Sequence, residues 1–201
     1  MKTIHKISMS LLIAALSLLT SCEISTGEGE DGYGYGAVDY RLGQTGPGGG
    51  KIFYVNPKGF TVQGHPSFGE SYTAYYLEAA PVDQGTSLFW GSMPSVLTAW
   101  VIGTGRKNTA LILAQYANAP AAKECRDYRG GGLDDWFLPN QDELNVLHDN
   151  SSYVDNLNAI DYYWSSTDFI YDDMYAYARK SSGGSSLRKD DTHRVRAIRA
   201  F

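Results

Sequence analysis

Tyr-Tyr-Trp-Ser-Ser at positions 162–166 and Arg-Val-Arg-Ala-Ile-Arg-Ala-Phe at positions 194–201 bracket a segment of a different chemical kind. Aromatic and aliphatic residues in the two brackets can anchor in a core, whereas Thr167–His193 is rich in Asp, Tyr, Ser and Gly. Short polar and tyrosyl residues are typical of recognition surfaces, including antibody loops. The contrast predicts a frame that displays a binding face.

Two helices are expected in the middle of the chain. Asn108 and Thr109 can cap the first, and Pro120 would interrupt or end it. Asn140 caps the second, because Glu143 three residues later completes an Asn version of the capping box.

Strands are expected on both sides of these helices, with Gly183-Gly184 as a hairpin turn near the end of the chain. The order predicts an α+β fold that ends in an antiparallel region. The expected strands are Ile52–Val55, Tyr75–Ala79, Tyr162–Ser166, Met174–Arg179, Leu187–Lys189 and Val195–Ala200.

The Gly-rich stretch at residues 43–51 invites comparison with a phosphate-binding loop, but the pattern fails. Thr45 stands where the first glycine of that loop should be, and Ile52 replaces the Ser or Thr that follows its lysine. Pro47 also removes a backbone donor that an anion would need. The stretch predicts a tight glycine turn into a strand, and no nucleotide site.

Residues 1–21 are typical of a bacterial lipoprotein signal. Lys2 and Lys6 precede an apolar run, Ile7–Leu19, that is short for a membrane-spanning helix and suits a secretory signal. The run closes on Leu-Thr-Ser-Cys, which resembles a lipobox whose Cys22 becomes acylated. An ordinary signal with a coincidental Cys, or a short buried helix, is the alternative. Acyl chains add about 0.8 kcal/mol per buried methylene, so Cys22 would anchor the chain to a membrane without spanning it.

Residues 22–41 are expected to form an acidic, Gly-rich tether, followed by one folded domain at residues 42–201. Such a tether has little apolar surface to bury and repels itself, so it would stay extended. The alternative is that Tyr33, Tyr35 and Tyr40 dock on the domain.

Charge and cysteine content exclude several classes of function. Lys and Arg number 17 against 22 Asp and Glu, which gives a formal net charge of −5 and disfavours nucleic acid as a partner. The chain has 2 cysteines, and acylation of Cys22 leaves only Cys125. One thiol cannot form an intrachain disulfide, a cysteine zinc site or a redox pair.

Seven short motifs then occur in a characteristic order: Gly48–Val55, Leu77–Pro81, Gly103–Gly105 with Asn108-Thr109, Cys125, Asp135–Pro139 with Asp142–Leu144, Tyr163–Ser166 and Arg194–Arg199. Residues 42–201 thereby resemble the Legionella collagen-like protein C-terminal domain family. Two of the motifs also resemble signatures of formylglycine-generating-enzyme-like and related C-type-lectin-like domains. The resemblance implies a C-type-lectin-like fold with two helices packed on mixed or antiparallel β-sheets.

Within that fold, Trp136, Phe137 and Leu138 are expected in the core, and Trp164 beneath the Ser-Ser turn. Of Arg194, Arg196 and Arg199, one or two would pair with acids such as Asp135 or Glu143 in preference to an anionic ligand.

No catalytic constellation is recognised. Formylglycine-generating enzymes use cysteine chemistry near the C-terminus, but no Cys follows Cys125. A buried, inert thiol is expected there, with a thiol activated by Arg126 as the alternative. His65, His148 and His193 have no metal-ligand spacing. The calcium motifs of sugar-binding lectins are absent, so no motif supports calcium and no cofactor is expected.

Thr167–His193 resembles the variable region of proteins diversified by retroelements, many of which are lipoproteins of this fold. Adenine-directed mutation of Asn-type codons cannot reach Glu, Gln or Trp, and the segment contains none of these. The candidate contact residues are Phe169, Tyr171, Asp172, Asp173, Tyr175, Tyr177, Arg179, Ser182, Ser185, Arg188, Asp190 and His193.

The sequence therefore predicts a lipid-anchored protein of the bacterial cell envelope, exposed at the outer membrane, that acts in adhesion. It would bind a protein or carbohydrate on another cell or surface, would contact membrane only through Cys22, and could form oligomers. A divergent formylglycine-generating-like enzyme and a structural component of a fimbria or envelope are the alternatives.

Overall fold

The computed structural model describes residues 39–91 and 94–201. The predicted signal segment, Cys22 and the tether up to residue 38 lie outside the described residues. Within the described ranges, no helix has both the length and the apolar character needed to cross a bilayer.

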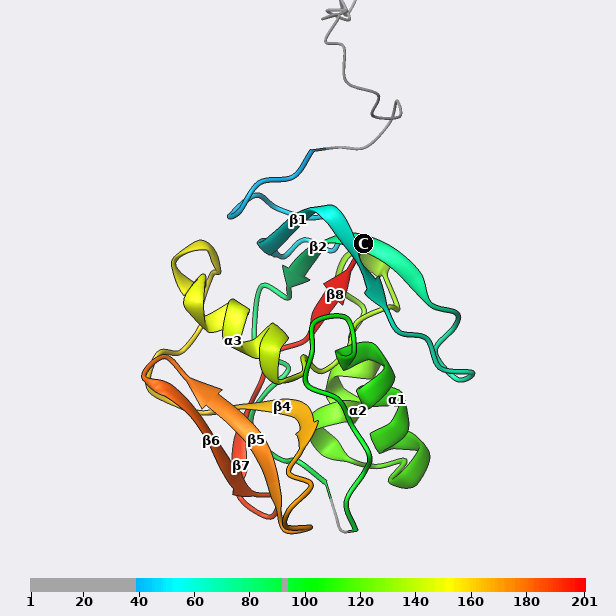
Figure 1. The fold of residues 1–201 in the computed structure, drawn as a ribbon. Coiled ribbons are helices and arrows are strands. Elements are labelled where there is room, and N and C mark those ends of the chain that lie inside the picture. The colour runs from blue at the N-terminus through cyan, green and yellow to red at the C-terminus, as the bar shows by residue number, and fades with distance from the viewer. Residues whose placement is uncertain (1–38, 92–93) are drawn as a thin grey trace, which may run out of the picture. The chain divides into compact units, whose positions relative to one another are not determined.

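The described chain folds as an α+β domain with two β-sheets and three α-helices (Figure 1). The smaller sheet has the strand order β1-β2-β8 and the larger one β3-β7-β4-β5-β6. Neighbouring strands are antiparallel except β4 and β7, which are parallel. The strands are β1 (Lys51–Val62), β2 (Tyr72–Ala79), β3 (Gly85–Phe89), β4 (Tyr163–Asp168), β5 (Tyr175–Lys180), β6 (Gly183–Arg188), β7 (Thr192–Val195) and β8 (Ile198–Ala200); the helices are α1 (Gly105–Gln115), α2 (Pro120–Asp127) and α3 (Gln141–Asp149), with 3-10 turns at Gly130–Gly132 and Ser151–Tyr153.

The prediction of two helices was wrong, because Pro120 begins a helix instead of ending one. It lies in the first turn of α2, where a residue without an N–H leaves no helical hydrogen bond unmade. The start of α1 was also misplaced, since the helix begins at Gly105. Asn108 and Thr109 therefore lie inside α1, and their side chains bond to neighbouring segments instead of capping the helix.

The predicted capping box of α3 is confirmed. The Asn140 side chain accepts a hydrogen bond from the Glu143 amide at 2.9 Å, and the Glu143 carboxylate accepts one from the Asn140 amide at 2.8 Å. Leu144 and Leu147 lie on the buried face. The apolar side chains of α3 therefore pack toward the smaller sheet. The two reciprocal hydrogen bonds of the capping box hold the N-terminus of the helix.

The C-terminal segment Val195–Ala200 was predicted as one strand, but it crosses between the two sheets. β7 belongs to the larger sheet and β8 to the smaller one. Between them Arg196 is 1% exposed, and its guanidinium donates to the carbonyls of Ala80 and Asn156, both at 2.8 Å. The crossing depends on these distant acceptors, so no local pattern could reveal it.

The β5–β6 hairpin turns two residues earlier than predicted. Lys180 pairs with Gly183, so residues 181–182 form the turn. Gly184 lies inside β6, where a Cβ would come within 1.8 Å of the Tyr177 hydroxyl oxygen. A side chain at position 184 would therefore have to displace that phenol.

The prediction that the C-terminal arginines pair with acids is confirmed. Arg199 binds Asp135 through two nitrogens, both at 2.8 Å. Arg194 and Arg196 share Asp83, at 3.0 and 2.7 Å. These pairs join the C-terminal segment to loops from earlier in the chain.

The predicted core motif Trp136-Phe137-Leu138 is fully buried and serves two clusters. Trp136 and Leu138 belong to a cluster built from the larger sheet, α1 and α2, together with Trp90 and Trp164. Phe137 points into a second cluster built from the smaller sheet and α3. This division follows from the extended backbone, in which successive side chains face opposite ways.

The glycine turn before β1 forms as predicted, and it wraps around a buried carboxylate. Glu78 accepts hydrogen bonds from the amides of Gly48 and Gly50 at 3.1 and 2.7 Å. A Cβ on Gly46 would lie 2.5 Å from the Glu78 carboxyl carbon. These two amides already bind an anion from the protein itself.

Tyr40 packs on the domain. The alternative interpretation of the tether, in which its tyrosines dock on the domain, is therefore correct for this residue. Its ring lies edge-on to those of Tyr76 and Phe201, with centroids 5.4 Å apart in each case. Ordered packing therefore begins at least two residues before the predicted boundary at Leu42.

Candidate functional site

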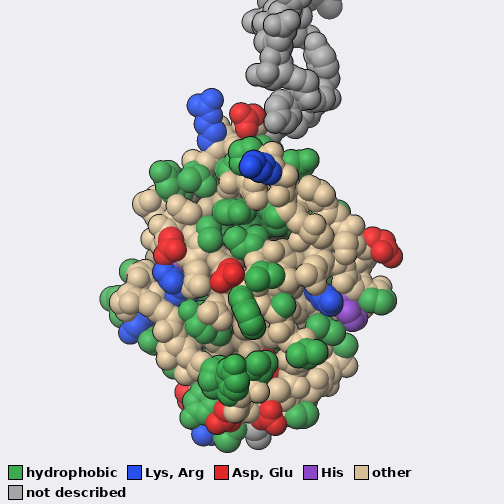
Figure 2. All heavy atoms as spheres, viewed as in Figure 1, with side chains coloured by type: hydrophobic (Ala, Val, Ile, Leu, Met, Phe, Trp, Pro, Cys, Tyr) green, Lys and Arg blue, Asp and Glu red, His purple; other side chains and the backbone are tan. Residues whose placement is uncertain are grey.

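Several exposed apolar side chains belong to two neighbouring segments, residues 94–103 and the turn after β4, which hydrogen bonds made by Ser95, Val96 and Thr98 hold side by side. Five of the large hydrophobic residues that are exposed in the described chain belong to these two segments. Figure 2 shows hydrophobic side chains gathered on the face and lower end that these segments occupy. We call this the tip surface: Leu97 (85% exposed), Trp100 (55%), Val101 (48%), Ile170 (52%) and Tyr171 (84%).

The backbone beneath the tip surface is held by a buried ion pair. The Lys189 ammonium lies 2.7 Å from the Asp168 carboxylate, and the two side chains are 3% and 0% exposed. Asp168 also accepts the Val96 amide at 2.6 Å, and the Lys189 nitrogen lies 4.7 Å from the ring centroid of Trp90. The pair therefore ties together the segment 94–103, the end of β4 and the end of β6.

Two buried asparagines hold the middle of the same segment. The Asn108 amide group bonds both the N–H and the C=O of Ala99, at 3.0 and 2.6 Å. Asn140 donates to the Val101 carbonyl at 2.6 Å. Trp100 is therefore exposed although its backbone is held on both sides.

Glu143 fixes the far end of the segment. Its fully buried carboxylate accepts the amides of Gly103 and Asn140, each at 2.8 Å. Burial raises the pKa of Glu143 to about 7, against the opposing effect of these hydrogen bonds. The anchor of the tip surface is therefore a group that titrates near neutral pH.

Four of the twelve sequence-predicted contact residues lie in the β4–β5 turn, next to the tip surface. Tyr171, Asp172 and Asp173 are exposed, and Phe169 is half-buried, with its ring edge-on to that of Tyr171 at 5.5 Å. The Ser95 hydroxyl donates to Asp173 at 2.5 Å, which links this turn to the segment 94–103. The structure brings these four residues together with the tip surface.

Three predicted residues, Tyr175, Tyr177 and Arg179, alternate along one face of β5. Arg179 donates to Asn145 at 2.8 Å and pairs with Asp149 at 2.5 Å, both on α3. The half-buried Tyr177 also reaches α3. Arg179 and Tyr177 therefore hold the helix against the sheet.

The remaining predicted residues are spread over β6, the turns at its two ends and β7. Arg188 faces the same side as Tyr175 and binds Asp190 through two nitrogens, at 2.9 and 2.7 Å. Ser182 lies in the hairpin turn at the other end of the strands, and Ser185 is on the opposite face. His193 lies edge-on to Trp164 at 4.7 Å. The twelve residues thus do not form one surface.

The segment Thr167–His193 is also not exposed along its whole length. Five of its residues are buried and support the frame: Thr167, Asp168, Ala176, Ala178 and Lys189.

Sequence reasoning missed the contribution of Leu97, Trp100 and Val101. The available signal was an apolar run between Pro94 and Gly103 that has neither helical nor strand periodicity. Such a run has the same composition whether it is buried or exposed.

Chemically reactive groups do not converge in the described residues. No three His, Cys, Asp or Glu side chains in ranges 39–91 and 94–201 come together as metal ligands. Cys125 is buried, as predicted, and burial raises the pKa of its thiol well above the ordinary value, the opposite of an activated thiol.

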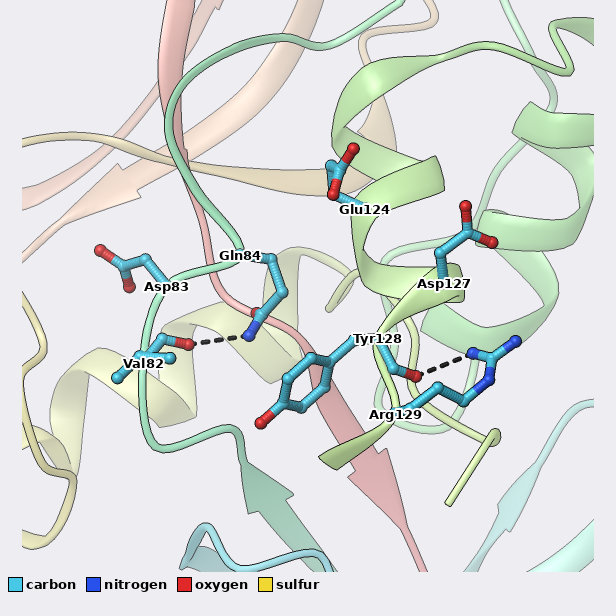
Figure 3. A pocket seen from close by; sticks show the side chains of 7 residues that line it. All are labelled: Val82, Asp83, Gln84, Glu124, Asp127, Tyr128 and Arg129. Atoms are coloured by element: carbon cyan, nitrogen blue, oxygen red, sulfur yellow. Dashed lines mark hydrogen bonds between the residues drawn. The ribbon is translucent and has the colours of Figure 1, made fainter. Parts of the chain in front are cut away.

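A hollow of about 340 Å³ lies beside α2 (Figure 3). Its side chains largely serve the fold: Gln84 donates to the Val82 carbonyl at 2.8 Å, and Arg129 donates to the Tyr128 carbonyl at 2.8 Å. The Asp83 carboxylate forms ion pairs with Arg194 and Arg196. We therefore place the candidate site at the tip surface.

Comparison with protein-family models gives no match, and comparison with curated proteins gives no significant match.

Proposed function

We propose that this protein is a lipid-anchored protein of the bacterial cell envelope, with a C-type-lectin-like domain that binds a protein ligand through the tip surface. The fold assignment is supported by the order of the sequence motifs. It is also supported by the pairing of β8 with β2, which keeps the two ends of the domain together.

The observation that carries the proposal is exposed apolar surface on a backbone that is held by hydrogen bonds. Leu97 and Tyr171 are 85% and 84% exposed. Next to Leu97, the Val96 amide bonds the carboxylate of the buried Asp168–Lys189 pair. The turn that carries Tyr171 is closed by the amides of Phe169 and Asp172, which donate to the carbonyls of Tyr175 and Phe169 at 3.1 Å. Large exposed apolar patches mark interaction sites in soluble proteins, and five exposed apolar side chains on two neighbouring segments favour such a site. A pre-organised backbone lowers the entropy lost on binding.

The chemistry of the tip surface favours a protein over a carbohydrate. Leu97, Val101 and Ile170 offer only aliphatic surface and cannot pair with sugar hydroxyls. Trp100 and Tyr171 are the side chain types most enriched among interface hot spots. The exposed carboxylates of Asp172 and Asp173 border this surface. The ligand therefore presents apolar surface edged by basic groups, and a sulfated polysaccharide is disfavoured.

The position of the tip surface in the domain suits display from a membrane. The first described residues lie beside the smaller sheet, where Tyr40 packs on Phe201, and the β4–β5 turn lies at the other end of the domain (Figure 1). A chain anchored at Cys22 would enter the domain at the end away from the β4–β5 turn. Replacing Cys22 by Ser should release the protein from the membrane fraction and abolish incorporation of labelled palmitate.

Diversification is part of this proposal, restricted to exposed positions of Thr167–His193. The five buried residues of that segment would stay constant, because each contributes to the frame. A near-copy of the coding sequence beside a reverse-transcriptase gene, with adenines at the exposed codons, would support it. A flanking region without such a copy would contradict it.

Site-specific photo-crosslinking tests the binding site even while the ligand is unidentified. A photo-reactive phenylalanine analogue would replace Leu97 or Tyr171 in the full chain on cells. Ile160 is the matched control, because it is 80% exposed and precedes β4, at the end of the strand away from the tip surface. The proposal expects one protein adduct shared by positions 97 and 171 and absent at 160. The same adducts at all three positions, or adducts only at 160, would contradict it.

A further inference from the structure

Among the described strands, β6 is an outer strand of the larger sheet, with β5 as its only neighbour. In the described part of the chain, Gly183–Leu187 make no main-chain hydrogen bond to any segment except β5. Alternate residues of such a strand direct their N–H and C=O groups outward, and those groups can pair with another strand.

The other three sheet edges are protected by features that β6 lacks. β1 has two register shifts, and Pro57 and Lys58 lie in the second. β8 is only three residues long, and its outer side pairs with Phe137 through hydrogen bonds of 2.8 and 3.0 Å. β3 contains a register shift between Gly85 and Leu88. Bulges, prolines, charged residues, short length and covering segments are the common means by which proteins block edge pairing.

β6 instead presents a regular and open edge. Its six residues pair with β5 in unbroken register, and none is a proline. The first four, Gly-Gly-Ser-Ser, have small side chains that allow another backbone to approach.

The position of the single charge in β6 selects the partner orientation. Arg188 is at the C-terminal end of the strand. Parallel, in-register pairing of two copies would place the two Arg188 side chains together. Antiparallel pairing about Ser185 or Ser186 places each Arg188 opposite the small, uncharged end of the other strand, so like charges do not meet.

We infer that two copies of this chain associate through antiparallel pairing of their β6 strands, which joins the two larger sheets into one. This inference does not depend on the proposed ligand-binding function. The dimer has two-fold symmetry, and either Ser185 or Ser186 lies at its axis.

Sedimentation equilibrium of the full chain carrying Cys22→Ser tests the inference without association through lipid. The chain should show a concentration-dependent dimer, and Ser186→Lys should leave only monomer because two lysines would meet at the axis or directly beside it. Thr61→Lys is the matched control, since it adds the same charge to an exposed hydroxyl position on the protected edge strand β1. That variant should dimerise like the parent.

A charge-swap experiment separates loss of the dimer from loss of the fold. Ser186→Lys and Ser186→Glu should each be monomeric alone, and an equimolar mixture should form a one-to-one heterodimer. A parent chain that is monomeric at all accessible concentrations would overturn the inference. So would a dimer that persists in Ser186→Lys, or a mixture that fails to restore association.

Discussion

Asp168 and Lys189 stand at opposite ends of the segment between the two C-terminal brackets, and they form a buried ion pair at 2.7 Å. One residue ends β4, and the other follows β6. The pair links the end of β4 to the end of β6. Asp168 also accepts a hydrogen bond from the Val96 amide, which fixes the segment that carries the tip surface.

Breaking this pair from one side should be strongly destabilising. Lys189→Met leaves the Asp168 carboxylate buried without its counter-charge, which typically costs about 3–5 kcal/mol. Urea unfolding followed by tryptophan fluorescence measures the loss. The double variant Asp168→Leu/Lys189→Met should be less destabilised than Lys189→Met alone, because it leaves no unpaired charge. A single variant within about 0.5 kcal/mol of the parent, the usual range for surface changes, would show that the pair does not hold the unit.

His148 should make the fold sensitive to acid. Both ring nitrogens are buried and lack a hydrogen-bond partner within the described residues, and burial lowers the His148 pKa from 6.5 to about 4. The unfolded chain therefore binds more protons than the folded chain between pH 6.5 and 4, so this group's contribution to stability is lost as pH falls through that window. His148→Phe keeps the ring packed against Tyr163 and removes the proton-binding site. Its free energy of unfolding should exceed that of the parent by on the order of 3 kcal/mol at pH 4, with a smaller difference at pH 7. An equal difference at both pH values would refute this assignment.

Glu143 should act in the opposite sense. Its folded pKa of about 7 lies above the ordinary value of 4.5, so the folded chain binds more protons between these pH values. This group's contribution to stability is fully present below pH 4.5 and is lost as pH rises toward 7. The destabilisation caused by Glu143→Gln should therefore shrink from pH 4.5 to 7. The measurement is best made in the His148→Phe background, because the two windows overlap. A destabilisation that grows with pH would mean that the carboxylate is preferred in the folded state.

Steric contacts make a sharp distinction between two glycines. A Cβ on Gly50 would lie 1.9 Å from the Ala79 carbonyl oxygen, whereas a Cβ on Gly91 would meet only the Ala119 side chain at 3.5 Å. Gly50→Ala should lower the melting temperature strongly, and Gly91→Ala should change it little. Equal thermal shifts in the two variants would contradict the close packing of the turn on β2.

Local signals predicted the elements whose determinants are near in sequence. The Asn140–Glu143 capping box, which spans four residues, predicts the start of α3. The apolar composition of Trp136-Phe137-Leu138 predicts that these residues are buried. The sheet crossing at Arg196 could not be predicted, because its acceptors lie 116 and 40 residues away. Pro120 was misjudged because a proline fits equally well after one helix and in the first turn of the next.

The candidate site was predicted only in part, for a related reason. Tyr171 and its neighbours were recognised from their composition, and the structure exposes them. Leu97 and Trp100 were not recognised, because an apolar residue in an irregular segment gives no sign of its exposure. Their position depends on Asn108, Asp168 and Asn140, whose roles become evident only when the segments meet.

The affinity of the tip surface for its protein ligand tests the central claim most directly. The ligand identified by crosslinking would be titrated against the full chain carrying Leu97→Ser/Tyr171→Ser, with Ile160→Ser as control. If both side chains are hot spots, the double variant should weaken binding about 100-fold or more while its fold is unchanged by circular dichroism. The control should bind like the parent. A folded double variant that binds with the parent's affinity would contradict the account.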